Sequence, residues 1–220
     1  LLADLQSTPG VTAAAHTWIP LLGGWAPTWH MRVEGHAAKD GEDMEIGNNI
    51  VSPGYWRTMG MTLLEGRDFE DRDRYPPDVE RMPSVALVNR AFARRFFGAQ
   101  TAVGRRFGVG EEKDRLGIRI IGVVPDALVA SPRVGGLPQV FFSSLQTNFP
   151  IGATFYVRSS LSATAIAPTL RQVVAARDPA LPVLAMKTLA RQLDDTLSVE
   201  RLIASLSVVF AALATVMAAL

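Results

Sequence analysis

The sequence feature that most constrains the fold is a short segment, 49–69, in which apolar residues are interrupted by proline and glycine. An extended run ends before Ser52, which is suited to cap a helix, and Pro53 has the fixed φ angle of a first helical position. Gly60 is placed to end that helix in a left-handed conformation, after which residues 61–64 resume as a strand. The segment therefore predicts a compact corner of strand, helix and strand.

Composition limits the classes of function. The 220 residues are 48% hydrophobic, which is enough for a core in one large domain or two small ones. The net charge is only +1 because 22 Lys and Arg are interleaved with 21 Asp and Glu, so nucleic acid is not an expected partner. Cysteine is absent, which excludes disulfides, zinc–thiolate sites and thiol nucleophiles, and fits a cytosolic or an extracytoplasmic location.

The two ends of the chain differ. The first residues lack an initiator Met and a charged leader, so we expect a segment of a longer protein. Residues 202–220 contain no charge, Pro or Gly and would span roughly 28 Å as a helix, close to the ~30 Å core of a bilayer. We predict the start of a transmembrane helix there, with a buried core helix as the alternative. Residues 189–201, with leucines four apart, predict a water-exposed stalk helix leading into it.

Between these ends, the patterns predict alternating strands and helices. Residues 153–188 predict a strand, a helix and a strand in that order, and Pro138 would confine its strand to an edge or to the first strand position. The charged stretch 68–82 predicts a solvated loop. The other predicted strands are 11–19, 29–34, 44–51, 83–89, 115–124 and 137–142, and the predicted helices are 1–6, 90–97 and 164–176.

The residue pattern of segment 49–69 resembles that of a known protein family. The pattern Asn49-x-Val-Ser-x-Gly-Tyr-x-x-x-x-Gly-Met-x-Leu-x-x-Gly-Arg-x-Phe69 resembles the corner in the extracytoplasmic (periplasmic core) domain of MacB-like, FtsX-like ABC transporter permeases. Three further segments fit the same family: 85–107, 118–126, and 178–182 with the stalk that follows it. The resemblance therefore covers nearly the whole chain.

The resemblance implies an α+β fold with two subdomains. A porter-like α/β subdomain would be formed by both ends of the segment, with an inserted, mostly β, sabre-like subdomain between them. The implied boundaries are 1–52 and 151–188 for the porter-like part, 53–65 for the connecting corner, 66–150 for the insert, 189–201 for the stalk and 202–220 for the transmembrane helix.

The resemblance also implies a function. The domain would transmit ATP-driven conformational change across the membrane for export, with residues 1–200 on the extracytoplasmic side of the inner membrane. The implied partners are an ABC ATPase domain or subunit, a second permease copy in a dimer and, in some members, a periplasmic adaptor protein. The chain itself contains no ATP-binding motif, so the nucleotide chemistry would lie on another segment or subunit.

Residues with the potential for chemistry are few. His30, Glu34 and His36 alternate, so in one strand they would share a face and could meet a metal ion. The spacing is common and no further partner can be named, so we expect no metal, catalytic or cofactor site, and no cofactor. Two alternatives stay open: an exported metal-dependent enzyme using these three residues, and a membrane-anchored sensor or binding module.

The glycine-rich and arginine motifs are better explained by structural roles than by anion binding. The run Gly104-x-x-x-Gly108-x-Gly110 lacks the Gly-Lys-Ser/Thr of a phosphate-binding loop. Arg67 and Arg105 each follow a glycine; they could bind an anion, but we expect them to fix turns through backbone carbonyls.

Overall fold

A computed structural model describes residues 1–23, 27–76, 82–110, 116–126, 136–147, 152–196, 207 and 210. Residues Leu1–Pro182 form one compact unit and Val183–Leu220 a second. The elements of the first unit are α1 (Leu2–Gln6), β1 (Val11–Thr17), β2 (Thr28–Val33), β3 (Glu45–Val51), α2 (Tyr55–Thr58), β4 (Glu65–Gly66), η1 (Asp71–Asp73), β5 (Val85–Asn89), α3 (Arg90–Phe97), β6 (Arg106–Val109), β7 (Ile118–Val124), β8 (Gln139–Ser143), β9 (Thr154–Ser159) and α4 (Ala163–Arg177).

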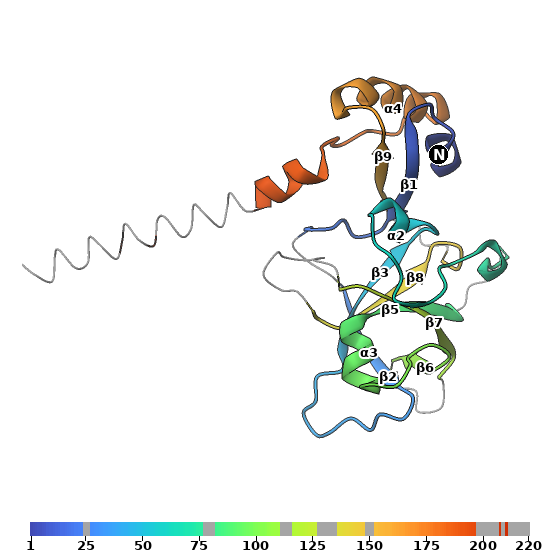
Figure 1. Ribbon diagram of the computed structural model, residues 1–220, viewed down its shortest axis with the longest axis vertical. Coiled ribbons are helices and arrows are strands. Elements are labelled where there is room, and N and C mark those ends of the chain that lie inside the picture. The colour runs from blue at the N-terminus through green and yellow to red at the C-terminus, as the bar shows by residue number, and fades with distance from the viewer. Residues whose placement is uncertain are drawn as a thin grey trace, which may run out of the picture. The chain divides into compact units, whose positions relative to one another are not determined.

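The strands form one sheet that closes on itself. Its order is β2-β6-β7-β5-β8-β3-β1-β9, and β2 also pairs with β3, so six of these strands make a ring (Figure 1). Strands β1 and β9 lie outside this ring and pair antiparallel with each other. We call the ring strands with α3 the closed-sheet lobe, and α1, β1, β9 and α4 the terminal lobe.

The closed-sheet lobe has a core inside the ring and another on its outer surface. The inner core contains side chains that alternate inward along the ring strands, such as Met31, Ile120 and Phe142, together with Phe92 from α3. The outer core forms where the segment 49–69 covers β5, β7 and β8. Its members are Ala15, Val51, Tyr55, Trp56, Phe69, Val85, Leu87, Ile121, Val124 and Phe141.

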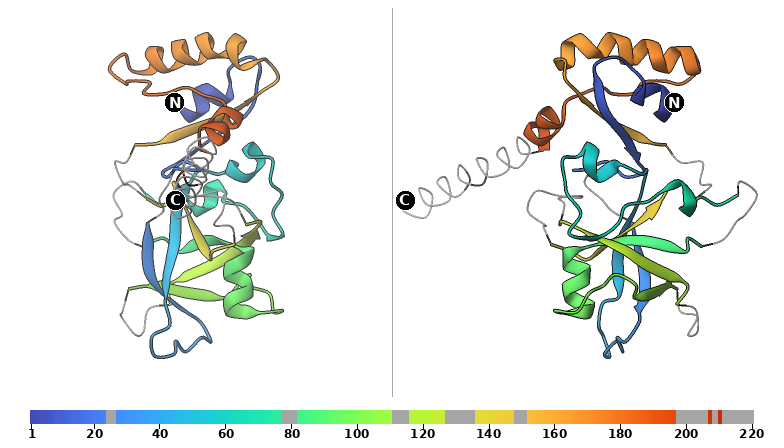
Figure 2. Two further views of the ribbon diagram at one scale, coloured as in Figure 1. Left: turned by 90° about the vertical axis from the view of Figure 1, so that its left-hand side faces the viewer. Right: turned by 45° about the vertical axis from the view of Figure 1, so that its right-hand side comes forward.

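The terminal lobe is built from both ends of the first unit. Helices α1 and α4 pack on the β1–β9 pair through the buried Leu5, Ala14, Ile166 and Leu170 (Figure 2). Ser162 caps α4, because its side chain accepts a hydrogen bond from the Ala165 N–H. Segments separated by the whole length of the domain thus share one small core.

Several predicted elements are confirmed with small shifts in their bounds, but two predicted strands are absent and one strand was missed. Residues 61–64 form no strand, and only Glu65–Gly66 pairs with β7. Residues 182–186 are exposed and form no strand. Strand β6 was not predicted.

Of the two positions predicted from Pro138, the structure agrees with the start of a strand and not with a sheet edge. Strand β8 lies between β3 and β5 in the ring and begins only at Gln139, after the proline. The Asn89 side chain donates to the Leu137 carbonyl (2.7 Å) and accepts from the Gln139 N–H (2.9 Å). Because the proline precedes the strand, its missing N–H does not interrupt the ladder, and a central position is allowed.

Two strands pair across the implied subdomain boundary. Strands β2 and β3 come from the part expected to be porter-like, yet β2 pairs with β6 and β3 pairs with β8. These two strands therefore complete the ring whose other members lie between residues 66 and 150. Only the beginning of the 1–52 segment, α1 and β1, belongs to the terminal lobe.

In the second unit, residues 189–196 are helical, in agreement with the start of the predicted stalk. The predicted transmembrane helix 202–220 lies outside the described residues, apart from Ser207 and Phe210. No helix within the described residues is long and apolar enough to span a membrane.

Candidate functional site

The two lobes of the first unit meet at a narrow junction between β1 and β3. A single residue pair, Thr17 opposite Val51, joins these strands. The bonds that flank it run from Trp18 N–H to Ile50 C=O and from Ser52 N–H to His16 C=O, both 2.9 Å. Since the bonds lie on either side of the pair, Thr17 and Val51 occupy the closely spaced type of antiparallel position. We call this junction, with helix α2, the waist.

Buried side chains replace the missing strand pairing at the waist. The Asn49 amide accepts from the Ile19 N–H (3.0 Å) and donates to the Ile19 carbonyl (2.9 Å), although Asn49 is only 3% exposed. The Ser52 hydroxyl accepts from the His16 N–H (2.9 Å). Ser52 therefore holds β1 and does not cap α2 as predicted; the N-cap is Gly54. The Ser52 bond joins the two lobes, the Asn49 bonds hold the segment that directly follows β1, and each satisfies a buried polar group that would otherwise destabilise the fold.

Helix α2 contacts both lobes at the waist. Its Tyr55 ring meets Tyr156 of β9 edge to face at 6.0 Å, and its Trp56 ring meets Phe141 of β8 edge to face at 4.7 Å. Burial raises the pKa of the Tyr55 and Tyr156 hydroxyls. The Tyr156 hydroxyl accepts from the Leu21 N–H at 2.8 Å. The helix is thus a wedge between the terminal lobe and the outer surface of the closed sheet (Figure 1).

The end of α2 confirms the predicted role of Gly60. Its φ angle is +74°, and the bonds from Gly60 N–H to Arg57 C=O (3.0 Å) and from Met61 N–H to Trp56 C=O (2.8 Å) are those of a Schellman motif. The Arg158 guanidinium of β9 donates to the nearby Thr58 carbonyl (3.0 Å). An arginine from the terminal lobe therefore also satisfies the end of the wedge helix.

The three residues proposed as metal ligands are not brought together. His30 faces Glu45 (3.8 Å), and His36 contacts the Glu42 carboxylate (3.0 Å). Glu34 accepts from the Arg106 N–H (2.8 Å), and the strand ends before it. Within the described part of the chain, no group of three or more His, Cys, Asp or Glu could hold a metal ion.

The glycine-rich run belongs to the closed sheet. Gly108 lies in β6 opposite Arg32, and Gly110 follows directly, its N–H bonded to the His30 carbonyl at 2.9 Å. Arg105 pairs with Glu34 (3.6 Å) and donates to Gln100 (2.8 Å). Arg105 thus contacts two side chains, and not the backbone carbonyls that were expected for it.

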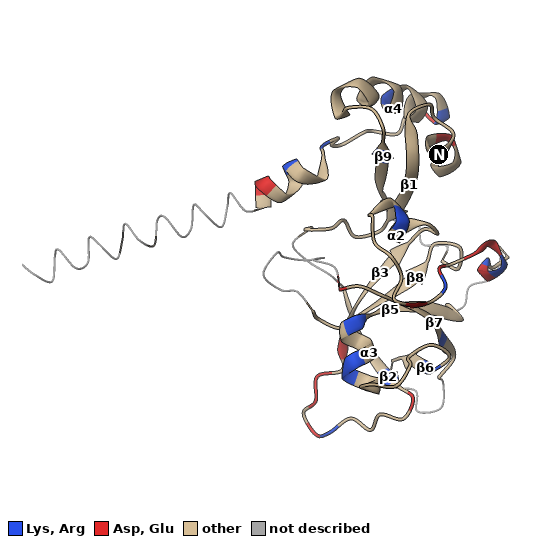
Figure 3. Cartoon of the chain, in the orientation of Figure 1, with Lys and Arg blue, Asp and Glu red and all other residues tan. Residues whose placement is uncertain are grey.

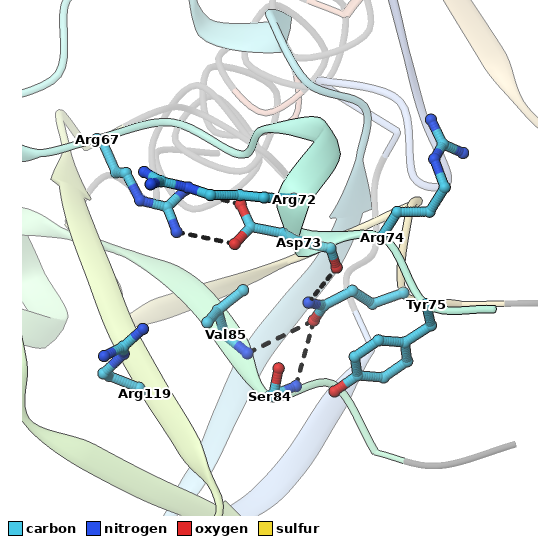
Figure 4. A pocket seen from close by; sticks show the side chains of 9 residues that line it. Arg67, Arg72, Asp73, Arg74, Tyr75, Ser84, Val85 and Arg119 are labelled. Atoms are coloured by element: carbon cyan, nitrogen blue, oxygen red, sulfur yellow. Dashed lines mark hydrogen bonds and ion pairs between the residues drawn. The ribbon is translucent and has the colours of Figure 1, made fainter. Parts of the chain in front are cut away.

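The other predicted arginine lies in a polar cleft of about 550 Å³ outside the ring (Figure 4). Arg67 donates to the Asp68 carbonyl (2.9 Å), as expected for a turn-fixing residue, and it also makes two bonds to Asp73, of 2.7 and 2.8 Å. Burial raises the pKa of Asp73, but the bonds from Arg67 and from the Glu70 N–H outweigh this and lower it overall. The cleft is lined by Arg67, Arg72, Asp73, Arg74, Tyr75, Ser84, Val85, Arg119 and Gln146.

Gln146 lines this cleft and connects two backbone segments beside it. Its amide donates to the Asp73 carbonyl (2.6 Å) and accepts from the Ser84 N–H (3.2 Å). Sequence reasoning missed Gln146, as it missed Thr17 and Arg158 at the waist, because each acts on a backbone far away in the sequence. The cleft residues Arg72 and Arg74 lie in the charged stretch 68–82, for which the sequence predicted only a solvated loop.

Comparisons with known proteins agree with this architecture. The family model for the MacB-like periplasmic core domain matches residues 6–206. A comparison with curated protein sequences gives no significant match. The chain therefore belongs to the MacB-like periplasmic core domain family, and it is the periplasmic domain of a MacB-like ABC transporter permease.

Two solved structures with TM-scores above 0.5 share the fold at low sequence identity, and a third is similar below that score. The periplasmic region of MacB from Actinobacillus actinomycetemcomitans is 12% identical, with a TM-score of 0.54 over 80% of this chain and 73% of that one. A domain of a proposed permease protein from Porphyromonas gingivalis is 20% identical, with a TM-score of 0.52 over 80% and 68%. The extracellular domain of the noncanonic ABC-type transporter YknZ from Gram-positive bacteria is 19% identical, with a TM-score of 0.49 over 80% and 81%.

Proposed function

We propose that this domain passes ATP-driven movement of a permease to the periplasmic side of the membrane, and that the waist makes the two lobes move together. The observation that carries the proposal is the set of hydrogen bonds that the buried Asn49 and Ser52 side chains make, with Ile19 just after β1 and with His16 of β1. A junction of one residue pair would bend easily if backbone pairing alone held it. Satisfied buried bonds at that point stiffen the connection.

The remaining parts of the proposal follow from the family. The ATP-hydrolysing partner is an ABC ATPase domain or subunit, the permease acts as a dimer, and some relatives of this kind engage a periplasmic adaptor. Residues 202–220 anchor the domain in the inner membrane, and the domain performs no catalysis of its own. We also propose that the functional division is between the terminal lobe and the closed-sheet lobe, with β2 and β3 in the latter.

The proposal is tested in the whole transporter reconstituted in nanodiscs. A fluorophore is attached at the exposed position Asp40, without cysteine chemistry, and energy transfer to a labelled lipid is recorded with and without ATP. We expect an ATP-dependent change that Asn49→Ala abolishes while ATP hydrolysis continues. Circular dichroism checks that the variant is folded.

A disulfide then separates loss of stiffness from loss of folding. The chain has no cysteine, and the spacing of Thr17 and Val51 suits a disulfide. Adding Thr17→Cys and Val51→Cys to the Asn49→Ala variant should restore the ATP-dependent change after oxidation and not after reduction. The matched control pair, Met31→Cys with Val109→Cys, bridges the same type of pair inside the closed-sheet lobe and should restore nothing. A full ATP response from Asn49→Ala, or no recovery on oxidation, would contradict a stiff waist.

A further inference from the structure

Two arginines face each other on the outer surface of the closed sheet, beside the polar cleft. Arg106 of β6 lies directly opposite Arg119 of β7. The bond from Ile120 N–H to Arg105 C=O (2.9 Å) flanks them, so they occupy the closely spaced type of antiparallel pair. Both side chains are exposed, and like charges placed directly opposite each other destabilise a sheet.

The acids whose positions the structure describes form no ion pair with these two arginines. Among the described residues, neither the Arg106 nor the Arg119 guanidinium has a hydrogen-bond or ion-pair partner. Glu34 is the acid opposite Arg106, but its carboxylate accepts from the Arg106 backbone N–H and pairs with Arg105. The two guanidinium groups therefore carry two positive charges on one patch of surface.

The adjoining cleft adds donors of the same kind. Arg119 lines it together with Arg67, Arg72 and Arg74 (Figure 4), and the ribbon is coloured for Lys or Arg beside β6 and β7 (Figure 3). Asp73 and Glu70 engage Arg67 and Arg72, and Asp71 engages Arg74. Within the described part of the chain, the arginine charge without a partner therefore lies at Arg119, which lines the cleft, and at Arg106 opposite it.

We propose that the Arg106–Arg119 pair at this cleft binds a phosphate-class dianion. Two arginines directly opposite each other can direct two guanidinium groups to one anion, and guanidinium N–H donors match phosphate oxygens. A monocarboxylate would satisfy one guanidinium and leave the second charge uncompensated, whereas a phosphate dianion compensates both. The source is either a free phosphate compound or the headgroup of a phosphate-monoester lipid, since both present the same chemistry. This site is independent of the proposed role of the waist.

The first arm of the test uses inorganic phosphate. The 220-residue chain in neutral detergent is titrated with phosphate at constant ionic strength, and the side-chain Nε–H signals of its arginines are followed by NMR. We expect a saturable shift at Arg106 and Arg119 that chloride does not produce. Arg119→Gln should weaken phosphate binding about tenfold or more, the effect of losing a charged hydrogen-bonding partner. Arg171→Gln, which changes an exposed arginine of α4, should leave the affinity unchanged.

The second arm distinguishes the two sources. The chain is placed in phosphatidylcholine nanodiscs with and without phosphatidic acid, in phosphate-free buffer. Arg119 signals that shift only with phosphatidic acid identify the lipid headgroup as the source; signals that shift only with added inorganic phosphate identify a free phosphate compound. Equal shifts in chloride and phosphate, or equal phosphate affinity in wild type and Arg119→Gln, would overturn the proposal.

Discussion

Replacing Gly66 with alanine tests the close contact between β4 and β7. Gly66 has a φ angle of +73°, and a Cβ atom there would lie 2.2 Å from the Ile121 carbonyl oxygen and 2.7 Å from the Gly122 Cα. Both neighbours are backbone atoms, so the two strands must separate. Two bonds that flank the contact would then weaken: Arg67 N–H to Ile121 C=O (3.0 Å) and Leu64 N–H to Val123 C=O (2.8 Å).

The magnitude follows from these contributions. The left-handed conformation costs alanine about 1–2 kcal/mol, and each weakened hydrogen bond costs roughly 1 kcal/mol. We therefore expect Gly66→Ala to lower the free energy of unfolding by about 3–4 kcal/mol. Gly104→Ala is the matched control: its φ angle is +90°, but no atom lies within 4 Å of the added Cβ, so only the conformational cost of about 1–2 kcal/mol applies.

The measurement is guanidinium unfolding of the chain in neutral detergent, followed by tryptophan fluorescence. Trp56 is 1% exposed and lies in the core that this contact supports, so its emission reports the loss of that core. If Gly66→Ala and Gly104→Ala lose the same stability, the backbone contact contributes nothing and the reasoning fails.

Three further predictions concern stability. Gly60→Val should lower the free energy of unfolding by about 1–2 kcal/mol or more, since valine at a φ of +74° is strained; an unchanged denaturation midpoint would show that the strain is absent. Arg67→Ala leaves a buried carboxylate at Asp73 with fewer partners and should cost about 2–3 kcal/mol at pH 7. Because the pKa of Asp73 is lowered in the folded protein, this stabilisation is present above about pH 4 and lost as pH falls further, so melting temperatures of wild type and variant should converge in acid, and a constant gap would contradict the ion pair. Burial lowers the pKa of His16, so its unfolded form binds protons more strongly and stability should fall as pH drops below about 6.5; His16→Asn should reduce that dependence, and an identical pH profile would assign it to other groups.

Local signals determined the elements whose ends depend on neighbouring residues. The Asn89 side chain caps α3 by accepting from the Phe92 N–H at 3.0 Å, and Gly98 ends the helix with a φ angle of +61°, within the bounds that the sequence predicted. Gly60 ends α2 one residue after its C-cap, in a Schellman motif. These signals are readable because the bonds that satisfy a helix end join residues only a few positions apart.

The family was also within reach of the sequence, because the corner and three other segments carry its pattern along most of the chain. Local patterns could not predict whether the candidate metal ligands share one face of a strand. Period-two spacing requires a continuous strand, and β2 ends at Val33, before Glu34. Whether three side chains share a face depends on where pairing stops, which no local pattern fixes.

Only the tertiary structure decided the closure of the sheet, the waist and the arginine cleft. Closure depends on β2 pairing with both β3 and β6, and the waist on Asn49 reaching Ile19 across 30 positions in the sequence. The Arg106–Arg119 pair arises from strand register, because a shift of one residue would place one arginine inside the ring. The sequence by itself therefore determined the helix ends at Gly60, Asn89 and Gly98, the turns and the protein family. The pairing of distant strands, which no single segment encodes, decided which residues meet.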